Sequence, residues 1–174
     1  MNQFGFRRAR STALALTQFT DEVLSNMDKG LPNGVIFIDP KKAFDIVEQV
    51  ILLGKLKSLG LSSNNLEWFH SYLYSRYQKT VIGEASSTSR KVSVGVHQGS
   101  FLGPLLFAIY INDLPKVLQN TKVTLFADDT ALYCSSQSAH DLQTMLNQNQ
   151  DLDRLDRWLY EHRLTLNVSK SKLC

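Results

Sequence analysis

The order of apolar and polar positions along the chain predicts helices and short strands that alternate irregularly. Apolar residues at helical spacing predict helices over residues 11–27, 43–58, 62–73, 100–111 and 139–161. Short β-rich runs between turn residues predict strands at 35–39, 79–83, 91–95, 123–127, 130–133 and 163–167. Because several neighbouring strands form hairpins, this order favours an α+β fold over a doubly wound parallel sheet.

Three acids stand out within this pattern. Asp128 and Asp129 lie side by side at the turn of a predicted hairpin, and Asp39 ends the apolar run 35–38. Adjacent carboxylates raise each other's pKa unless a cation lies between them, and Mg²⁺ binds such oxygens. If two strands of one sheet bring Asp39 beside the hairpin, the three acids suit a two-metal phosphoryl-transfer site. From these residues alone, solvated acids in turns and at strand ends remain an equally open interpretation.

Composition restricts the choice of protein class. The chain has 174 residues, of which 43% are hydrophobic and 20% charged, as expected for one globular domain. The net charge of +3 is compatible with a nucleic-acid partner but does not by itself indicate one. No apolar run is long enough to span a bilayer, and no signal peptide is visible, so an intracellular protein without a membrane partner is expected. Cys134 and Cys174 show neither metal-site spacing nor a disulfide framework.

Four segments, in order, resemble motifs A to D of reverse transcriptases: Asp39-Pro-Lys-Lys-Ala-Phe-Asp45, Gln98-Gly-Ser-Phe-Leu-Gly-Pro104, Phe126-Ala-Asp-Asp129 and Leu164-Thr-Leu-Asn-Val-Ser-Lys-Ser-Lys172. Each motif alone is a weak signal, but four in the right order are specific. Their spacing is similar to that of non-LTR retrotransposon enzymes of the LINE and jockey kind. The opening Gln3-Phe-Gly-Phe-Arg7, followed by Ser11-Thr12, strengthens this resemblance.

The resemblance implies a partial reverse transcriptase domain over residues 1–174. The expected architecture is a polymerase palm, an antiparallel sheet backed by helices. A remnant of the fingers would cover about 1–34 and 60–95, and the thumb would be absent. The implied activity is DNA synthesis on an RNA template by two-metal nucleotidyl transfer, with two Mg²⁺ or Mn²⁺ ions. The implied partners are an RNA template, a DNA primer, dNTPs, and the fingers and thumb segments of a parent polyprotein.

The resemblance also assigns site residues. Asp39, Asp128 and Asp129 would be catalytic and bind the metal ions. Four residues would bind the incoming nucleotide, with the Phe44 ring excluding a 2′-OH: Phe44, Gln98, Gly99 and Ala127. Lys170 or Lys172 would serve as a general acid toward the pyrophosphate leaving group.

The sequence departs from the family pattern at three positions: Pro40 follows the first acid, His97 precedes Gln98-Gly99, and Phe101 is bulkier than usual. Pro40 removes a strand N–H beside the expected metal. Three functions therefore stay open. The first is a polymerase palm that is weak or inactive as this fragment alone. The second is an inactive nucleic-acid-binding remnant of a mobile element. The third is another two-metal enzyme such as a nuclease, against which the ordered motifs argue.

Overall fold

The computed structural model describes residues 2–148 and 150–174. The chain forms two compact units: Met1–Ala43 with Ile111–Cys174, and Phe44–Tyr110. In the described residues, no helix is long and apolar enough to cross a membrane.

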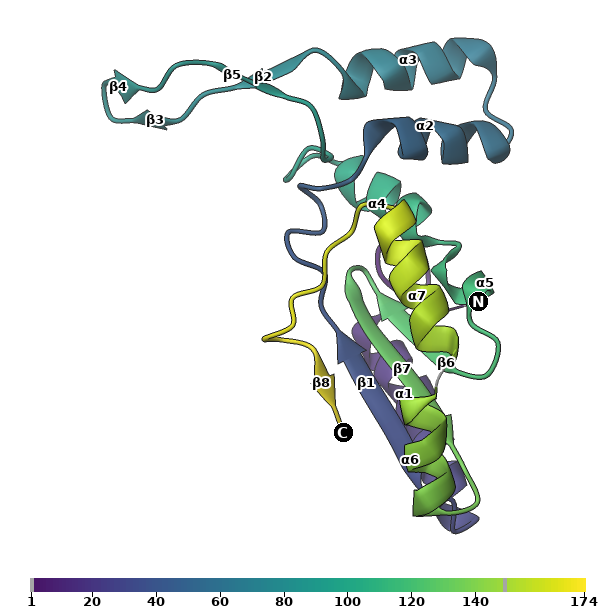
Figure 1. The fold of residues 1–174 in the computed structure, drawn as a ribbon. Coiled ribbons are helices and arrows are strands. Elements are labelled where there is room, and N and C mark those ends of the chain that lie inside the picture. The colour runs from purple at the N-terminus through teal and green to yellow at the C-terminus, as the bar shows by residue number, and fades with distance from the viewer. Residues whose placement is uncertain (1, 149) are drawn as a thin grey trace. The chain divides into compact units, whose positions relative to one another are not determined.

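The first unit is built on a four-stranded antiparallel sheet (Figure 1). In spatial order its strands are β6 (Lys122–Phe126), β7 (Asp129–Ser135), β1 (Asn33–Ile38) and β8 (Lys172–Leu173). The predicted hairpin is confirmed, since β6 and β7 pair up to Phe126 opposite Asp129. On its other side β7 pairs with β1, with Ile38 opposite Thr130. This register brings the C-terminal end of β1 to the same end of the sheet as the hairpin turn.

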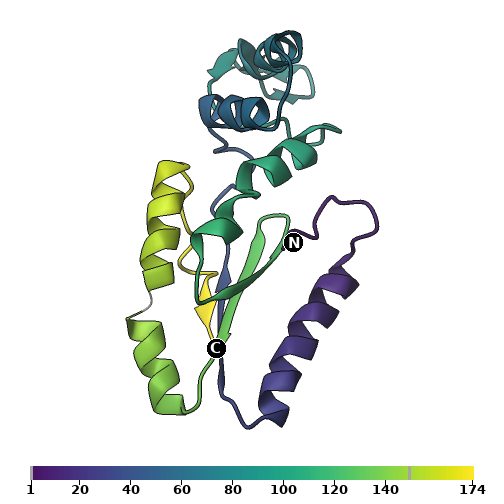
Figure 2. The same ribbon diagram turned by 90° about the vertical axis from the view of Figure 1, so that its right-hand side faces the viewer.

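Helices cover both faces of this sheet (Figure 2). They are α1 (Thr12–Asp28), α5 (Leu114–Val117), α6 (Ala139–Asn147) and α7 (Gln150–Glu161). Helix α1 begins at Thr12, one residue after the predicted start, and the side chain of the capping Ser11 accepts a hydrogen bond from the Leu14 N–H. Its Phe19 ring packs edge-on against Phe37 and Tyr133 on one face. On the other face α6 lies close to Gly34, as Leu142 shows. Because strand side chains alternate, the Phe37 face also carries Asp39.

The second unit contains a pair of packed helices, α2 (Gln49–Ser58) and α3 (Ser63–Leu73), with Leu52, Leu56 and Leu73 fully buried. Two short antiparallel pairs follow, β2 (Arg76–Gln78) with β5 (Arg90–Val92) and β3 (Val81–Ile82) with β4 (Ala85–Ser86). The strands predicted at 79–83 and 91–95 are therefore shifted and divided. Helix α4 (Gly103–Ile111) begins three residues later than predicted.

The helix predicted from Ala43 is wrong over its first six residues, since α2 begins only at Gln49. Backbone carbonyls that a helix would use as acceptors instead accept hydrogen bonds from a distant segment of the chain. The Val96 N–H donates to the Phe44 carbonyl at 2.9 Å, and the Gly95 N–H donates to Val47 at 2.7 Å. Asp45 therefore lies in a turn that precedes α2.

Two further predictions at the C-terminal end need correction. The single helix expected over 139–161 is two helices, with a turn at Gln148; Asn149 lies outside the described residues. The strand expected at 163–167 is reduced to one bridge between Leu166 and Pro40. The strand that joins the sheet edge is instead β8, which begins at Lys172.

Candidate active site

The hairpin turn and the end of β1 lie at the same end of the sheet and carry Asp39, Asp128 and Asp129. We call this group of three acids the acidic edge of the first unit. Ala127 and Asp128 make the turn, and Asp129 is the first residue of β7. Asp39 follows β1 directly, and β1 is the neighbour of β7 in the sheet. The fully buried Leu125 fixes the hairpin below the turn. The structure thus brings the two acidic segments, 89 residues apart in sequence (128 − 39), to adjacent strand ends.

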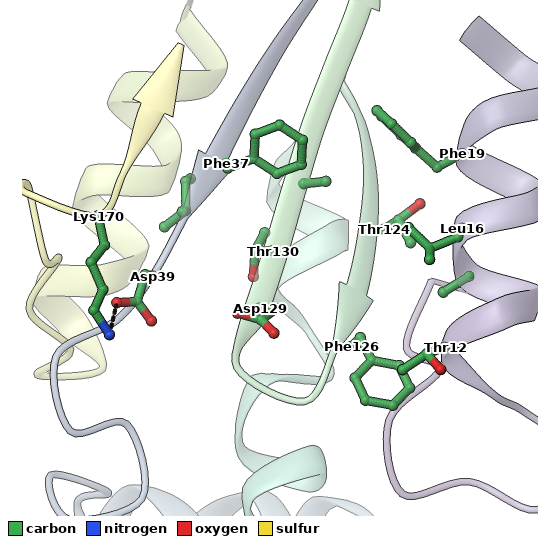
Figure 3. Close-up of a pocket in the computed structure, with 13 residues that line it drawn as sticks. Thr12, Leu16, Phe19, Phe37, Asp39, Thr124, Phe126, Asp129, Thr130 and Lys170 are labelled. Atoms are coloured by element: carbon green, nitrogen blue, oxygen red, sulfur yellow. Dashed lines mark ion pairs between the residues drawn. The ribbon is translucent and has the colours of Figure 1, made fainter. Parts of the chain in front are cut away.

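Asp39, Asp129 and Lys170 line a cavity of about 400 Å³ on the α1 face of the sheet (Figure 3). The rest of its wall is mostly apolar and includes Ala15, Leu16, Phe19, Phe37 and Phe126. Figure 3 shows Asp39 and Asp129 on neighbouring strands, with the Lys170 side chain reaching Asp39 from the other side. A polar rim over an apolar wall is typical of ligand sites.

The electrostatics of this edge are those of crowded negative charge. Burial raises the pKa of Asp128, and the neighbouring charges of Asp129 and Asp39 raise it further. A hydrogen bond from its own backbone N–H and the charge of Lys170 act in the opposite direction. The Lys170 Nζ lies 3.6 Å from Asp39 Oδ2, and the Asn167 side chain donates to the same oxygen at 3.1 Å. A divalent cation would offset the excess charge that remains around Asp128.

The donor chemistry therefore suits a hard cation, since all three acids offer carboxylate oxygens. Among residues 2–148 and 150–174, no three His, Cys, Asp or Glu side chains come close enough to hold one ion together. Lys170 is the cation that contacts Asp39 in this arrangement.

The segment that carries Lys170 is fixed to the acid strand by backbone hydrogen bonds. The Asn167 N–H donates to the Asp39 carbonyl, and the Lys41 N–H donates to Thr165, both at 2.7 Å. Pro40 lies between these bonds, opposite Leu166, where the ladder uses no N–H of its own. The proline is thus accommodated without a lost bond. Sequence reasoning missed Asn167, although it lies within the motif D segment.

Three predicted nucleotide-binding residues belong to the second unit. The Phe44 ring stacks on Phe107, with ring centres 4.5 Å apart. Gln98 is exposed, and its side-chain amide donates to Asp45 at 2.7 Å. Gly99 has a positive φ of 74° with open space where a side chain would lie. The remaining two predicted site residues belong to the first unit: Ala127 is buried in the acid turn, and Lys172 pairs with Phe37 in the sheet.

His97 and Ser100 shape the entry to α4. The Ser100 hydroxyl donates to the His97 carbonyl at 2.8 Å and accepts from the Gly103 N–H at 2.9 Å. Burial, and then the charge of Arg76, lower the pKa of His97. Ser100 thus holds the turn before the helix. Phe101 is almost fully exposed.

Comparison with known proteins identifies the chain. The family described as "Reverse transcriptase (RNA-dependent DNA polymerase)" matches residues 1–174. The chain belongs to the reverse transcriptase family. It is 31% identical over 175 residues to the probable RNA-directed DNA polymerase from transposon X-element of Drosophila melanogaster. It is 30% identical over 177 residues to the RNA-directed DNA polymerase from mobile element jockey of Drosophila funebris. The resemblance to jockey-like non-LTR enzymes is confirmed.

These alignments cover 98% and 97% of this reverse transcriptase chain, which spans 19% of the length of each relative. Among solved structures, telomerase from Candida albicans superposes with a TM-score of 0.69 at 17% identity, over 94% of this chain and 30% of that one. Apo telomerase from Candida tropicalis, truncated of its C-terminal domain, gives a TM-score of 0.68 at 16% identity, over 99% of this chain and 36% of that one. This likeness confirms the predicted α+β palm fold.

Proposed function

We propose that this chain is the catalytic core of a retrotransposon polymerase that synthesises DNA on an RNA template. The observation that carries the proposal is the acidic edge of the first unit. Three acids at positions that match motifs A and C are crowded onto adjacent strand ends, where burial and then the neighbouring charges of Asp129 and Asp39 raise the pKa of Asp128. A protein gains nothing for its stability from such crowding, whereas a cation-dependent reaction needs it.

Asp39, Asp128 and Asp129 are proposed to hold two divalent ions, Mg²⁺ or Mn²⁺. When bound, such ions stabilise the attacking and leaving oxygens of a phosphoryl displacement. The chain's own residues would supply the ligands and their charge. Asp39 and Asp128 would be the main carboxylate ligands, and Asp129 would add a third carboxylate. Lys170, whose Nζ lies 3.6 Å from Asp39 Oδ2, is proposed to give a proton to the pyrophosphate leaving group. Lys172 is the less favoured general acid, because Lys170 is the lysine that contacts Asp39, whereas Lys172 lies in β8 opposite Phe37.

Phe44, Gln98, Gly99 and Ala127 are proposed to contact the incoming dNTP. Phe44 would exclude a 2′-OH, and its stacking on Phe107 supports a fixed ring. Replacement by valine should admit ribonucleotides while much of the dNTP activity remains. Equal discrimination by Phe44→Val and the wild type would contradict the gate and leave Phe44 as a packing residue.

The proposed partners are an RNA template, a DNA primer and the fingers and thumb of the parent polyprotein. Within this chain we assign residues 1–34 and 60–95 to the fingers and the remainder to the palm. The alternative is an inactive nucleic-acid-binding remnant of a mobile element. The retained acids favour the polymerase, and only an assay separates the two.

The test is Mg²⁺- or Mn²⁺-dependent primer extension on an RNA template. One sample is the 174-residue chain, and the other is a polypeptide extended at both ends by the segments that flank it in its relatives. We expect synthesis by the extended polypeptide and little by the short chain, because misplacement of a triphosphate by about 1 Å costs on the order of 10²-fold. Asp128→Asn accompanies each as the control. No Asp128-dependent synthesis by the extended polypeptide would favour the inactive remnant.

A further inference from the structure

The turn that carries Asp128 has an unusual backbone. Ala127 is the first central residue of a two-residue hairpin turn, and its φ is +57°. Glycine or asparagine usually occupies such a position, because a Cβ makes positive φ unfavourable. For an alanine the conformation is unfavourable and persists only when the surroundings impose it. Some group must therefore hold this peptide in place.

That group is the side chain of Gln3, which is 4% exposed. Its Nε2 donates to the Ala127 carbonyl at 3.2 Å, and its Oε1 accepts from the Ala127 N–H at 3.0 Å. One amide thus satisfies both backbone groups of the strained residue. The same Oε1 accepts from the Gly5 N–H at 2.7 Å, which orients the amide.

The segment around Gln3 is itself attached to β6. Its backbone forms a parallel bridge with Leu125, with Phe4 donating to the Leu125 carbonyl and Leu125 donating to Asn2, both at 2.8 Å. Gly5 lies so close to the turn that a Cβ there would be 2.2 Å from the Ala127 nitrogen. The glutamine therefore approaches the turn along a fixed path, and the small residue at position 5 makes that approach sterically feasible.

We propose that Gln3 is a positioning residue, whose amide clamps the Ala127 peptide and so sets the direction of the Asp128 and Asp129 carboxylates. The effect on metal binding rests on the proposed function, whereas the clamp itself does not. Amide groups that orient metal ligands typically change metal affinity 10- to 100-fold when removed. Gln3→Met keeps the length of the side chain without its polar groups, and Gln3→Asn keeps the amide one methylene short.

The first readout is amide hydrogen exchange by NMR on the 174-residue chain. Loss of a hydrogen bond worth about 1 kcal/mol should speed exchange of the Ala127 amide by at least about fivefold in both Gln3 variants. The amide of Leu132 in the middle of β7 should be unaffected. Gly5→Ala, which retains Gln3 but pushes on the same peptide, is the second perturbation and should act in the same direction. An Ala127 amide that exchanges at the wild-type rate in all three variants overturns the clamp.

The second readout is binding of Mn²⁺ alone, followed by electron paramagnetic resonance. We expect about tenfold weaker binding in Gln3→Met and Gln3→Asn. The matched control is Leu142→Ala, which removes a buried α6 side chain on the opposite face of the sheet. An equal loss in the control, or none in the Gln3 variants, overturns the positioning effect. A wild-type chain that binds no Mn²⁺ overturns the proposed metal site, and amide exchange then decides the clamp alone.

Discussion

Two carboxylates of the first unit, Asp151 and Asp128, have pKa values that are shifted in opposite directions. Asp151, at the start of α7, is 1% exposed. It accepts hydrogen bonds from the backbone N–H groups of residues 119, 120 and 121 at 2.7–3.0 Å, and from Arg154 at 2.6 Å. Burial alone would raise the pKa of Asp151, but these donors together lower it. At Asp128 burial and the nearby acids act in the same direction, and its pKa is raised.

The difference distinguishes a structural charge from the one that we propose to be functional. Folding supplies Asp151 with permanent donors, so its charge stabilises the loop that leads into β6. Folding leaves Asp128 among like charges, so its ionised form is less favourable in the native state than in the unfolded chain. The first site is complete within the protein, whereas the second is proposed to be completed by a bound cation.

The largest expected effect concerns Asp128→Asn in the polypeptide extended at both ends. Loss of one metal-binding carboxylate removes several kcal/mol of transition-state stabilisation, which corresponds to a rate reduction of about a thousandfold or more. Primer extension measures the rate. Urea unfolding of the 174-residue variant should show unchanged or slightly increased stability, since a disfavoured charge is removed. A large loss of stability would mean that Asp128 is a structural acid like Asp151.

Asp151→Asn should give the reverse result. The substitution leaves three backbone donors and Arg154 around a neutral amide, and removal of one partner from a buried charged network costs about 3 kcal/mol. Urea unfolding at neutral pH measures this loss. Mn²⁺ affinity, scaled to the folded fraction, should be unchanged, because Asp151 contacts residues 119–121 before β6, whereas the hairpin acids follow the other end of that strand. Weaker Mn²⁺ binding by the folded variant would show that the two sites are coupled.

The comparison also predicts opposite dependences on pH. Because the native pKa of Asp151 is lowered, its contribution is present above the unfolded pKa of about 3.9 and is lost as the pH falls through the native value. The stability difference between wild type and Asp151→Asn should therefore narrow below about pH 4. For Asp128, whose pKa is raised, wild type should be the less stable protein at neutral pH, and acid should remove this deficit. Unfolding curves between pH 3 and 7 would test both signs, and parallel pH profiles would contradict the comparison.

The sequence alone was sufficient for the motif C hairpin and for α1, because both carry strong local signals. The apolar runs on either side of Asp128-Asp129 predict β6 and β7, and Ser11 predicts the start of α1. The three proposed metal ligands came from the same local signals. Their arrangement depends on register, which no single segment contains.

Prediction failed where distant backbone groups decide the local structure. Residues 43–48 are apolar enough for a helix, yet Gly95 and Val96 take their carbonyls as partners. Gln3 and Asp151 were missed as supports for a different reason. Each is an ordinary polar residue in the sequence. Gln3 matters because it hydrogen-bonds to backbone 124 residues away, and Asp151 because it hydrogen-bonds to backbone about 30 residues away. Buried polar side chains that satisfy a remote backbone have no local pattern by which to recognise them.

The smallest expected effect, that of Lys170→Met, separates two interpretations of the cation at the acidic edge. The Lys170 side chain is 70% exposed, so its ion pair with Asp39 should contribute no more than about 1 kcal/mol to stability. Lys170 competes with a metal ion for Asp39, and its removal should therefore strengthen Mn²⁺ binding a few-fold. If Lys170 is also the general acid, primer extension by the extended polypeptide should fall despite this tighter binding, by about 10²-fold or more.

Lys172→Met is the matched control, because that lysine belongs to the same segment but pairs with Phe37. Equal effects of the two substitutions would mean that Lys170 acts only through net charge, and unchanged synthesis with tighter Mn²⁺ binding would leave it as a counter-ion alone.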